Sequence, residues 1–312
     1  MQHTKPSFSE LFEPAVEFPD IDMKERLAML VGLDEVKMRL TKILGLLVHA
    51  EGLKKWAHKH HPDAGGLISI VTRRPPLVIF AGDVGAGKSE LAQTIGDAVA
   101  RQENINITLL PMSLSARGKG MVGEMTQLVS AAFDHTIEQA QKMQSNSGSK
   151  AHGAVILLID EADALAQSRE NAQMHHEDKA GVNAFIRGID RLGNGRLPVA
   201  VIMCTNRPES LDPAIRRRAA DLFVFTRPNE EQRRAVIEGP LTSLGLSKKE
   251  VDKIVKLTGP RDNGDIGFTF SDLTQRLLPT ILLDAYPDNK VTAASATRIT
   301  ESISPTSPFK ES

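Results

Sequence analysis

The most informative segment of this chain of 312 residues is Gly82-Asp83-Val84-Gly85-Ala86-Gly87-Lys88-Ser89. It follows an apolar run at residues 77–80 and precedes a helical pattern that extends to Ala100. Its small residues allow successive backbone N–H groups to turn inward around an anion. The helix that follows adds the positive end of its dipole at the same point. The segment therefore predicts a phosphate-binding loop between a buried strand and a helix.

The same eight residues fit the pattern G-x-x-x-x-G-K-S/T, which is the P-loop or Walker A motif. In this motif the lysine, here Lys88, reaches the β and γ phosphates of a nucleotide, and the hydroxyl of Ser89 binds Mg²⁺. The strand-to-helix context that the motif requires is also present. We therefore expect residues 82–89 to bind a nucleoside triphosphate together with Mg²⁺.

A second apolar run, residues 155–159, ends in Asp160 and Glu161, as in a Walker B motif. A carboxylate at the end of a buried strand is a suitable Mg²⁺ ligand, and we assign this role to Asp160. Glu161 is then placed to orient and polarise the attacking water. An Asp-Glu pair alone would be explained more simply as a solvated strand end, and its combination with the P-loop favours the nucleotide site.

Apolar runs alternate with helical patterns at residues 77–80, 107–110, 155–159, 199–203 and 222–225. Runs without polar alternation are typical of strands that are covered on both faces. Their alternation with helices predicts an α/β fold with a parallel sheet flanked by helices, and after Pro228 only helical patterns remain. We therefore divide the chain into an N-terminal arm (1–30), a large nucleotide-binding domain (31–228), a helical lid domain (229–301) and a disordered tail (302–312).

The composition excludes several classes of protein. The 38 Lys and Arg residues nearly balance the 39 Asp and Glu residues, which argues against a protein that coats nucleic acid or an anionic membrane. The only cysteine, Cys204, cannot form an intrachain disulfide and is best explained as a buried strand residue. The N-terminus lacks the apolar core of a signal peptide, and the best apolar run, residues 43–48, is too short to span a bilayer. We therefore expect a soluble cytoplasmic protein with no membrane partner.

A third strand pattern carries further polar residues. The run at residues 199–203 leads to Thr205-Asn206-Arg207-Pro208, and then to Leu211-Asp212-Pro213-Ala214 and three arginines. Together with the Walker A and B motifs, these segments resemble the AAA+ ATPases over roughly residues 31–283. The resemblance implies that ATP and Mg²⁺ are the cofactors. It also implies that Asn206 is sensor 1, which hydrogen-bonds near the γ-phosphate and the attacking water.

The three arginines are Arg216, Arg217 and Arg218. They cannot all be folded into an apolar core, because each buried guanidinium needs a partner. The resemblance implies that arginines at this place are fingers that reach the nucleotide of the next subunit and stabilise the transition state. We assign this role to Arg217 and Arg218, with Arg216 as the weaker candidate, and the sequence leaves open which of them acts.

Other segments match further marks of the family. Residues 31–36 resemble the entry motif, in which the backbone around Gly32 contacts adenine. Residues 267–273 resemble the lid segment but lack the arginine that many branches use as sensor 2, and whether Arg276 replaces it stays open. The residues that fall where the family places pore loop 1 are Lys119, Gly120, Met121 and Val122. A methionine, large and flexible, stands there in place of the usual aromatic residue.

Within the AAA+ ATPases, the chain resembles the pachytene-checkpoint group of HORMA-domain remodellers, through Arg218-Ala219-Ala220-Asp221 and the layout of a single module. This resemblance implies a homo-oligomeric ring, expected to be a hexamer, that uses ATP to open a HORMA-domain protein and thereby regulates antiphage signalling in CBASS operons. The alternative is a nucleic-acid-associated AAA+ protein, such as a clamp or helicase loader. The balanced charge counts against that alternative, so we do not expect nucleic acid as a partner. A nucleotide-controlled scaffold that hardly hydrolyses ATP is the least favoured interpretation.

Overall fold

The computed structural model describes residues 6–113, 124–144, 153–166, 176–195, 197–260 and 265–308. The chain divides into two compact units. The first comprises Met1–Leu27, Glu35–Ala81 and Ser89–Val224, and the second comprises Ala28–Asp34, Gly82–Lys88 and Phe225–Ser312. P-loop residues 82–88 therefore group with the mainly helical second unit, as do residues 31–34 and 225–228, whereas most of the expected nucleotide-binding domain lies in the first unit.

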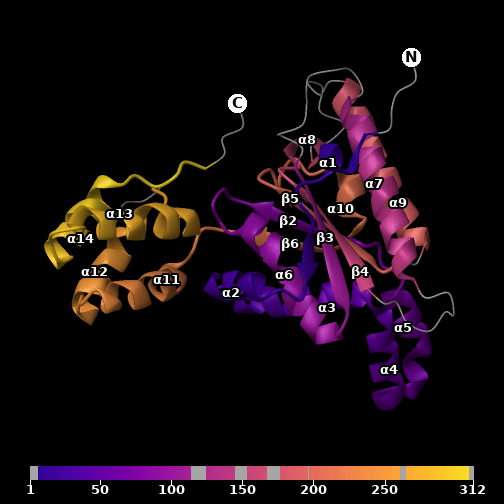
Figure 1. The fold of residues 1–312 in the computed structure, drawn as a ribbon, viewed down its shortest axis with the longest axis horizontal. Helices are drawn as coiled ribbons and strands as arrows, with labels where there is room; N and C mark the ends of the chain where they lie inside the picture. Colours follow the sequence, from indigo (N-terminus) through magenta and orange to yellow (C-terminus); the bar gives the residue numbers. More distant parts are fainter. Residues whose placement is uncertain are drawn as a thin grey trace. The chain divides into compact units, whose positions relative to one another are not determined.

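The sheet has six strands in the described part of the chain, in the order β1-β3-β4-β5-β2-β6 (Figure 1). Strands β3, β4, β5 and β2 are parallel to their neighbours in this series, and β1 pairs antiparallel with β3. The bounds are β1 (Val16–Phe18), β2 (Leu77–Gly82), β3 (Asn106–Ser113), β4 (Gly153–Asp160), β5 (Val199–Thr205) and β6 (Ala219–Phe225). Strands β2 to β6 coincide with the five apolar runs, which confirms the predicted α/β fold.

Strand β1 lies in the segment that the sequence analysis treats only as an arm. Val16 pairs with Leu109 of β3, and the ring of Phe18 packs against Gly96, so closely that a Cβ there would approach a ring carbon to 2.3 Å. Phe18 is 2% exposed. A strand of three residues between Pro14 and Pro19 is too short to show an alternating pattern, so the sequence analysis missed it.

Helices cover both faces of the sheet, as expected for a buried parallel sheet. Every residue of β2 and β5 is buried. On one face lie α7 (Glu124–Met143) and α9 (His176–Gly195), whose Phe133 and Phe185 rings meet edge to face with centroids 5.7 Å apart. Figure 1 shows α3 (Asp34–Val48) and α6 (Lys88–Glu103) on the side of the sheet away from α7 and α9.

The remaining helices of the first unit are short. Their bounds are α1 (Phe8–Leu11), α2 (Ile21–Met29, which extends into the second unit), α4 (Ala50–His60), the 3₁₀ turn η1 (Pro62–Ala64), α5 (Gly65–Val71), α8 (Asp163–Ala166) and α10 (Pro213–Arg216). None of the helices in the described ranges has the length and apolar character needed to cross a membrane.

The second unit is helical after Phe225, as the sequence analysis expects for a lid. Its helices are α11 (Glu230–Ser243), α12 (Lys248–Leu257), the π-helical turn η2 (Asp272–Leu277), α13 (Leu278–Ala285) and α14 (Ala293–Ser302). Helix α11 begins at a capping box, in which Asn229 and Gln232 satisfy each other's backbone N–H groups. Ile237, Ile254, Phe268 and Ile281 are fully buried in a common apolar core.

Candidate active site

The carboxyl ends of β4 and β5 carry the acids and the asparagine that the sequence analysis singled out. The two strands are parallel neighbours, with Ile159 opposite Met203, so their carboxyl ends lie at one edge of the sheet. Strand β2 is the next neighbour, with Ala81 opposite Thr205, and the P-loop follows one residue later in the chain. In open parallel sheets this edge is where ligands bind.

Asp160 and Glu161 lie where β4 ends. Asp160 is partly exposed and accepts a hydrogen bond from the backbone N–H of Glu161 at 2.8 Å. Glu161 is exposed and has a φ of +51°, a left-handed conformation that is uncommon for residues other than glycine. The turn is tied to the neighbouring strand, because the N–H of Ala162 donates to the carbonyl of Cys204 at 2.9 Å. Strained backbone of this kind clusters at functional sites, which agrees with a role for Glu161 in catalysis.

Asn206, the candidate sensor 1, is held by Asp163, a residue that the sequence analysis missed. The Oδ1 atom of Asp163 accepts hydrogen bonds from the Thr205 hydroxyl and the Asn206 backbone N–H, both at 2.7 Å. Its Oδ2 atom accepts from the side-chain Nδ2 of Asn206 at 3.2 Å. Asp163 therefore fixes the backbone and the amide of Asn206 together. Its position three residues after Asp160 was the available signal.

The P-loop, in the second unit, has the backbone of a phosphate-binding loop. Gly82, Gly85 and Gly87 have positive φ values of 141°, 70° and 91°. At Gly82 a side chain is excluded, because a Cβ would lie 2.0 Å from the carbonyl oxygen of Phe225. The ammonium of Lys88, which is 6% exposed, donates to the carbonyls of Gly82 at 3.0 Å and Asp83 at 2.7 Å. The remaining P-loop candidates, Val84 and Ala86, lie in the same loop, and Ser89 follows at the start of α6 with its side chain exposed.

Comparison with known proteins shows the family of this chain. The profile of the ATPase family associated with various cellular activities (AAA) matches residues 78–227. CD-NTase-associated protein 6 of Escherichia coli strain MS 115-1 is 63% identical over 307 residues, which cover 98% of this chain and 98% of that protein. The chain belongs to the AAA ATPases.

This AAA ATPase is also similar to solved structures. A chain of the E. coli MS115-1 HORMA:CdnC:Trip13 complex matches with a TM-score of 0.91 and 62% identity, covering 98% of this chain and 100% of that one. The structure of Rhizobiales Trip13 matches with a TM-score of 0.74 and 55% identity, covering 96% and 100% of the two chains. The resemblance to AAA+ ATPases of the pachytene-checkpoint type is therefore confirmed.

The three candidate finger arginines of the ATPase differ in their surroundings. Arg218 donates from Nε to Asp190 Oδ1 at 2.6 Å and from Nη2 to Asp190 Oδ2 at 2.9 Å. The hydrogen bond with Asp190 raises the pKa of Arg218. The side chains of Arg216 and Arg217 are exposed and make no hydrogen bond or ion pair with residues that the structure describes. Arg218 is therefore held by its own chain, whereas the side chain of Arg217 is accessible.

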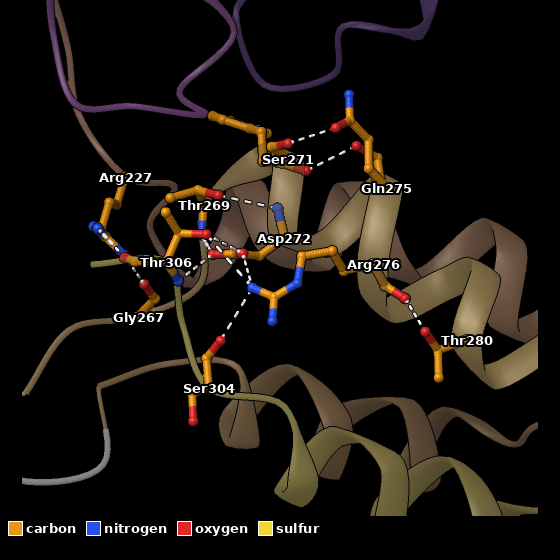
Figure 2. A network of polar contacts seen from close by, with 12 residues as sticks. Arg227, Gly267, Thr269, Ser271, Asp272, Gln275, Arg276, Thr280, Ser304 and Thr306 are labelled. Atoms are coloured by element: carbon orange, nitrogen blue, oxygen red, sulfur yellow. Dashed lines mark hydrogen bonds and ion pairs between the residues drawn. The ribbon is translucent and has the colours of Figure 1, made fainter. Parts of the chain in front are cut away.

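Two further candidate nucleotide-contacting residues of the ATPase, Gly32 and Arg276, lie in the second unit. The carbonyl oxygen of Gly32 accepts a hydrogen bond from Nε2 of Gln232 at 2.7 Å, which fixes the loop that the sequence analysis assigns to adenine. Arg276, the possible replacement for a sensor 2 arginine, donates from Nη1 to Asp272 at 2.7 Å and to the carbonyl of Ser304 at 3.1 Å (Figure 2). Both Arg276 contacts stay within the lid and the C-terminal segment.

The C-terminal segment differs from the expectation of a disordered tail. The structure describes the chain as far as residue 308, and Thr306 donates two hydrogen bonds to Asp272, from its N–H at 3.0 Å and its hydroxyl at 2.6 Å. Composition does not predict this order, because Ser and Pro residues favour irregular structure, which a buried acceptor can still fix. The structure does not describe the pore-loop candidates, which are Lys119, Gly120, Met121 and Val122, so their assignment to pore loop 1 stays a prediction.

Proposed function

We propose that this AAA ATPase uses ATP hydrolysis to open a HORMA-domain protein and to separate it from an associated CD-NTase. The single observation that carries the proposal is the match to a chain of the HORMA:CdnC:Trip13 complex, at 62% identity over nearly the full length of both chains. The name of the 63% identical relative, a CD-NTase-associated protein, points to the same setting. Removing the HORMA protein would then switch off a signalling enzyme of antiphage defence in the cytoplasm.

The residue roles in hydrolysis follow from the chemistry of each group. Lys88 binds the β and γ phosphates, the backbone of the P-loop donates N–H groups to them, and the backbone at Gly32 contacts adenine. Ser89 and Asp160 hold Mg²⁺, and both fit this role because hydroxyl and carboxylate oxygens are its preferred ligands and both side chains are accessible. Bound Mg²⁺ neutralises charge on the phosphates.

Glu161 and Asn206 act on the attacking water in this proposal. Glu161 accepts a hydrogen bond from the water and polarises it, as a general base does. Asn206 orients the water and the γ-phosphate through its amide, which Asp163 holds through a hydrogen bond of 3.2 Å. A fixed amide loses little conformational freedom when substrate binds, so its position contributes directly to the rate.

We further propose that the ATPase works as a homo-oligomeric ring, a hexamer, in which Arg217 reaches the nucleotide of the adjacent subunit. An arginine supplied in this way stabilises the charge of the transition state. The exposure of the Arg217 side chain and its lack of a polar partner among the described residues support this role. Residues 119–122 form the pore loop that grips the substrate, with Met121 as the side chain that contacts it.

A nucleotide trap tests the proposal. Glu161→Gln protein is purified with Mg-ATP from host cells that also express a HORMA protein and a CD-NTase, and bound proteins are identified by mass spectrometry. The expected result is an ATP-dependent complex with the HORMA protein, absent from the Lys88→Ala control. Recovery of nuclease-sensitive nucleic acid or replication proteins in its place would overturn the proposal and favour a clamp or helicase loader.

A further inference from the structure

Arg227 joins three segments of the second unit through one side chain. Its Nε donates to Oδ2 of Asp83 in the P-loop at 2.6 Å. Its Nη1 donates to the carbonyl of Gly267 at 2.7 Å, and its Nη2 to the carbonyl of Thr306 at 2.6 Å (Figure 2). The side chain is only 14% exposed. A single guanidinium therefore connects the P-loop, the loop before η2 and the C-terminal segment.

Asp83 is the residue through which Arg227 acts on the P-loop. The Oδ1 atom of Asp83 accepts a hydrogen bond from the backbone N–H of Val84 at 2.8 Å, and its carbonyl accepts one from Lys88 Nζ at 2.7 Å. A rotation of the Asp83 side chain would break its hydrogen bond with the N–H of Val84, and Asp83 is also the residue whose backbone carbonyl binds the lysine ammonium. Arg227 prevents this rotation by holding the second carboxylate oxygen.

The charge of Asp83 requires a partner. Its side chain is 18% exposed, so water screens it poorly, and it belongs to a loop that binds phosphates. An unpaired carboxylate there would repel a nucleotide and would itself be unfavourable when buried. The guanidinium of Arg227 neutralises it, and its planar fork holds donors to the two backbone carbonyls in fixed directions, which the flexible stem of a lysine does not reproduce.

Asp272 holds the C-terminal segment that Arg227 contacts at Thr306. This fully buried carboxylate accepts hydrogen bonds from the backbone N–H and the hydroxyl of Thr306, at 3.0 and 2.6 Å. The carbonyl of Thr306 is thereby held where Nη2 of Arg227 binds it (Figure 2). The C-terminal segment is thus part of the support of Arg227.

We propose that Arg227 is a positioning residue for ATP: it neutralises and orients Asp83 in the P-loop and links nucleotide affinity to the C-terminal segment at Thr306. This inference concerns the ATPase activity and does not depend on which protein the ring remodels.

The test is a double-mutant cycle on the full chain, with the Kd for ATP, KM and kcat as readouts. Arg227→Met leaves Asp83 unpaired and is expected to raise the Kd and KM for ATP at least tenfold, with kcat changed less than threefold. Arg227→Lys is expected to recover only part of the affinity. In the Asp83→Asn/Arg227→Met protein the unpaired charge is gone, and at least a fivefold recovery of affinity over Arg227→Met is expected.

Arg234→Met is the matched control, because Arg234 forms an ion pair with Asp252 in the same unit. It is expected to leave the Kd for ATP within twofold of the wild-type value. A wild-type Kd for Arg227→Met would overturn the proposal. So would a double variant no better than Arg227→Met, because a loss of folding alone is not relieved by Asp83→Asn.

The link to the C-terminal segment has its own test. Thr306→Pro removes both donors to Asp272, the N–H and the hydroxyl, whereas Thr306→Val removes only the hydroxyl. We expect Thr306→Pro to raise the Kd for ATP at least threefold and Thr306→Val to have a smaller effect in the same direction. Unchanged affinity in Thr306→Pro would refute the link.

Discussion

At the scale of single residues, Asp163 joins the ends of two strands. It lies at the start of α8, just after β4, and it binds Thr205 and Asn206 at the end of β5. Three hydrogen bonds from two successive residues fix both the backbone and the amide of Asn206. A side chain held in this way is preorganised for the role that we propose for Asn206.

Asp163→Ala is therefore expected to lower kcat for ATP hydrolysis by about 10²-fold, the effect typical of a small misplacement of a reacting group. The Kd for ATP is expected to stay within about threefold, because the P-loop is unchanged. Steady-state kinetics and equilibrium binding measure the two quantities. Asp134→Ala, which breaks the surface ion pair with Arg191, is the control and should leave both unchanged. A kcat for Asp163→Ala equal to that of the control would contradict the role.

Glu161 and Lys88 are expected to separate hydrolysis from binding. Glu161→Gln removes the proposed general base and should lower kcat by about 10²- to 10⁴-fold while ATP still binds. Lys88→Ala removes the buried ammonium of the P-loop and should abolish ATP binding. Titration with a fluorescent ATP analogue, together with phosphate release, distinguishes the two. Retained ATP affinity in Lys88→Ala would argue against the phosphate site.

The sequence predicts those residues whose neighbours in the site are also neighbours in the chain. The P-loop, Asp160-Glu161 and the Thr205-Asn206 pair each lie in one short segment with a fixed strand or helix context. Asp163 was missed because its partners lie more than 40 residues later, at Thr205 and Asn206. Arg227 was missed for the same reason, since Asp83 is 144 residues away in the sequence.

At the scale of elements, the π-helical turn η2 begins with a carboxylate that is charged despite being buried. Asp272 accepts hydrogen bonds from the N–H of Thr269, from Thr306 and from Arg276 (Figure 2). Burial alone would raise its pKa, but these hydrogen bonds outweigh burial and lower the pKa from 3.8 to about 2. The ionised form is therefore favoured by folding.

The lid is expected to lose stability in acid through Asp272. Because the folded pKa is below the unfolded value, the stabilisation is complete above about pH 4 and is lost as the pH falls toward 2, a change of about 2 kcal/mol. Asp272→Asn should be less stable at neutral pH, and its deficit relative to wild type should shrink between pH 4 and 2. Denaturant unfolding at a series of pH values measures this. Parallel stability curves for the two proteins would contradict the explanation.

Strand β1 contributes a second prediction at this scale. Phe18 is buried against Gly96, and Phe18→Ala is expected to reduce the free energy of unfolding by about 3 kcal/mol. Phe8, which is 41% exposed, provides the control, and Phe8→Ala should cost much less. Equal losses in denaturant unfolding would show that β1 is not anchored by Phe18.

The strands with apolar runs were all predicted, because four or five consecutive residues that are nearly all apolar leave a clear signal in the sequence. β1 was not predicted, because its pairing depends on β3, about 90 residues away, and its three residues carry no pattern of their own. The order of residues 303–308 was likewise unpredictable from composition, because it depends on the buried carboxylate of Asp272.

At the scale of the whole molecule, the ring and its substrate lie beyond what one chain's sequence pattern establishes. Balanced charge and complete hydrolysis motifs favour a working ATPase, and the family resemblance supplied the class of partner. No residue pattern in the chain specifies a HORMA protein, since recognition of another protein depends on the surfaces of both.

Subunit mixing tests the action of Arg217 between neighbours. Arg217→Ala and Glu161→Gln proteins should each hydrolyse ATP slowly. Mixing them should restore part of the activity, because some subunits with an intact Glu161 then lie next to a subunit with an intact Arg217. Arg218→Ala is the control, because Arg218 binds Asp190 of its own chain and its loss should not be complemented. No recovery for Arg217→Ala, or equal recovery for both arginine variants, would contradict the assignment.

The most direct measurement is the release of a HORMA protein from its CD-NTase. The two partners, labelled with a fluorescent donor and acceptor, are assembled and mixed with the ATPase and Mg-ATP. The proposed function predicts that energy transfer is lost at a rate set by ATP turnover with the wild-type protein and is retained with Glu161→Gln. A complex that stays intact while the wild-type protein hydrolyses ATP, or that separates equally fast with Glu161→Gln, would contradict it.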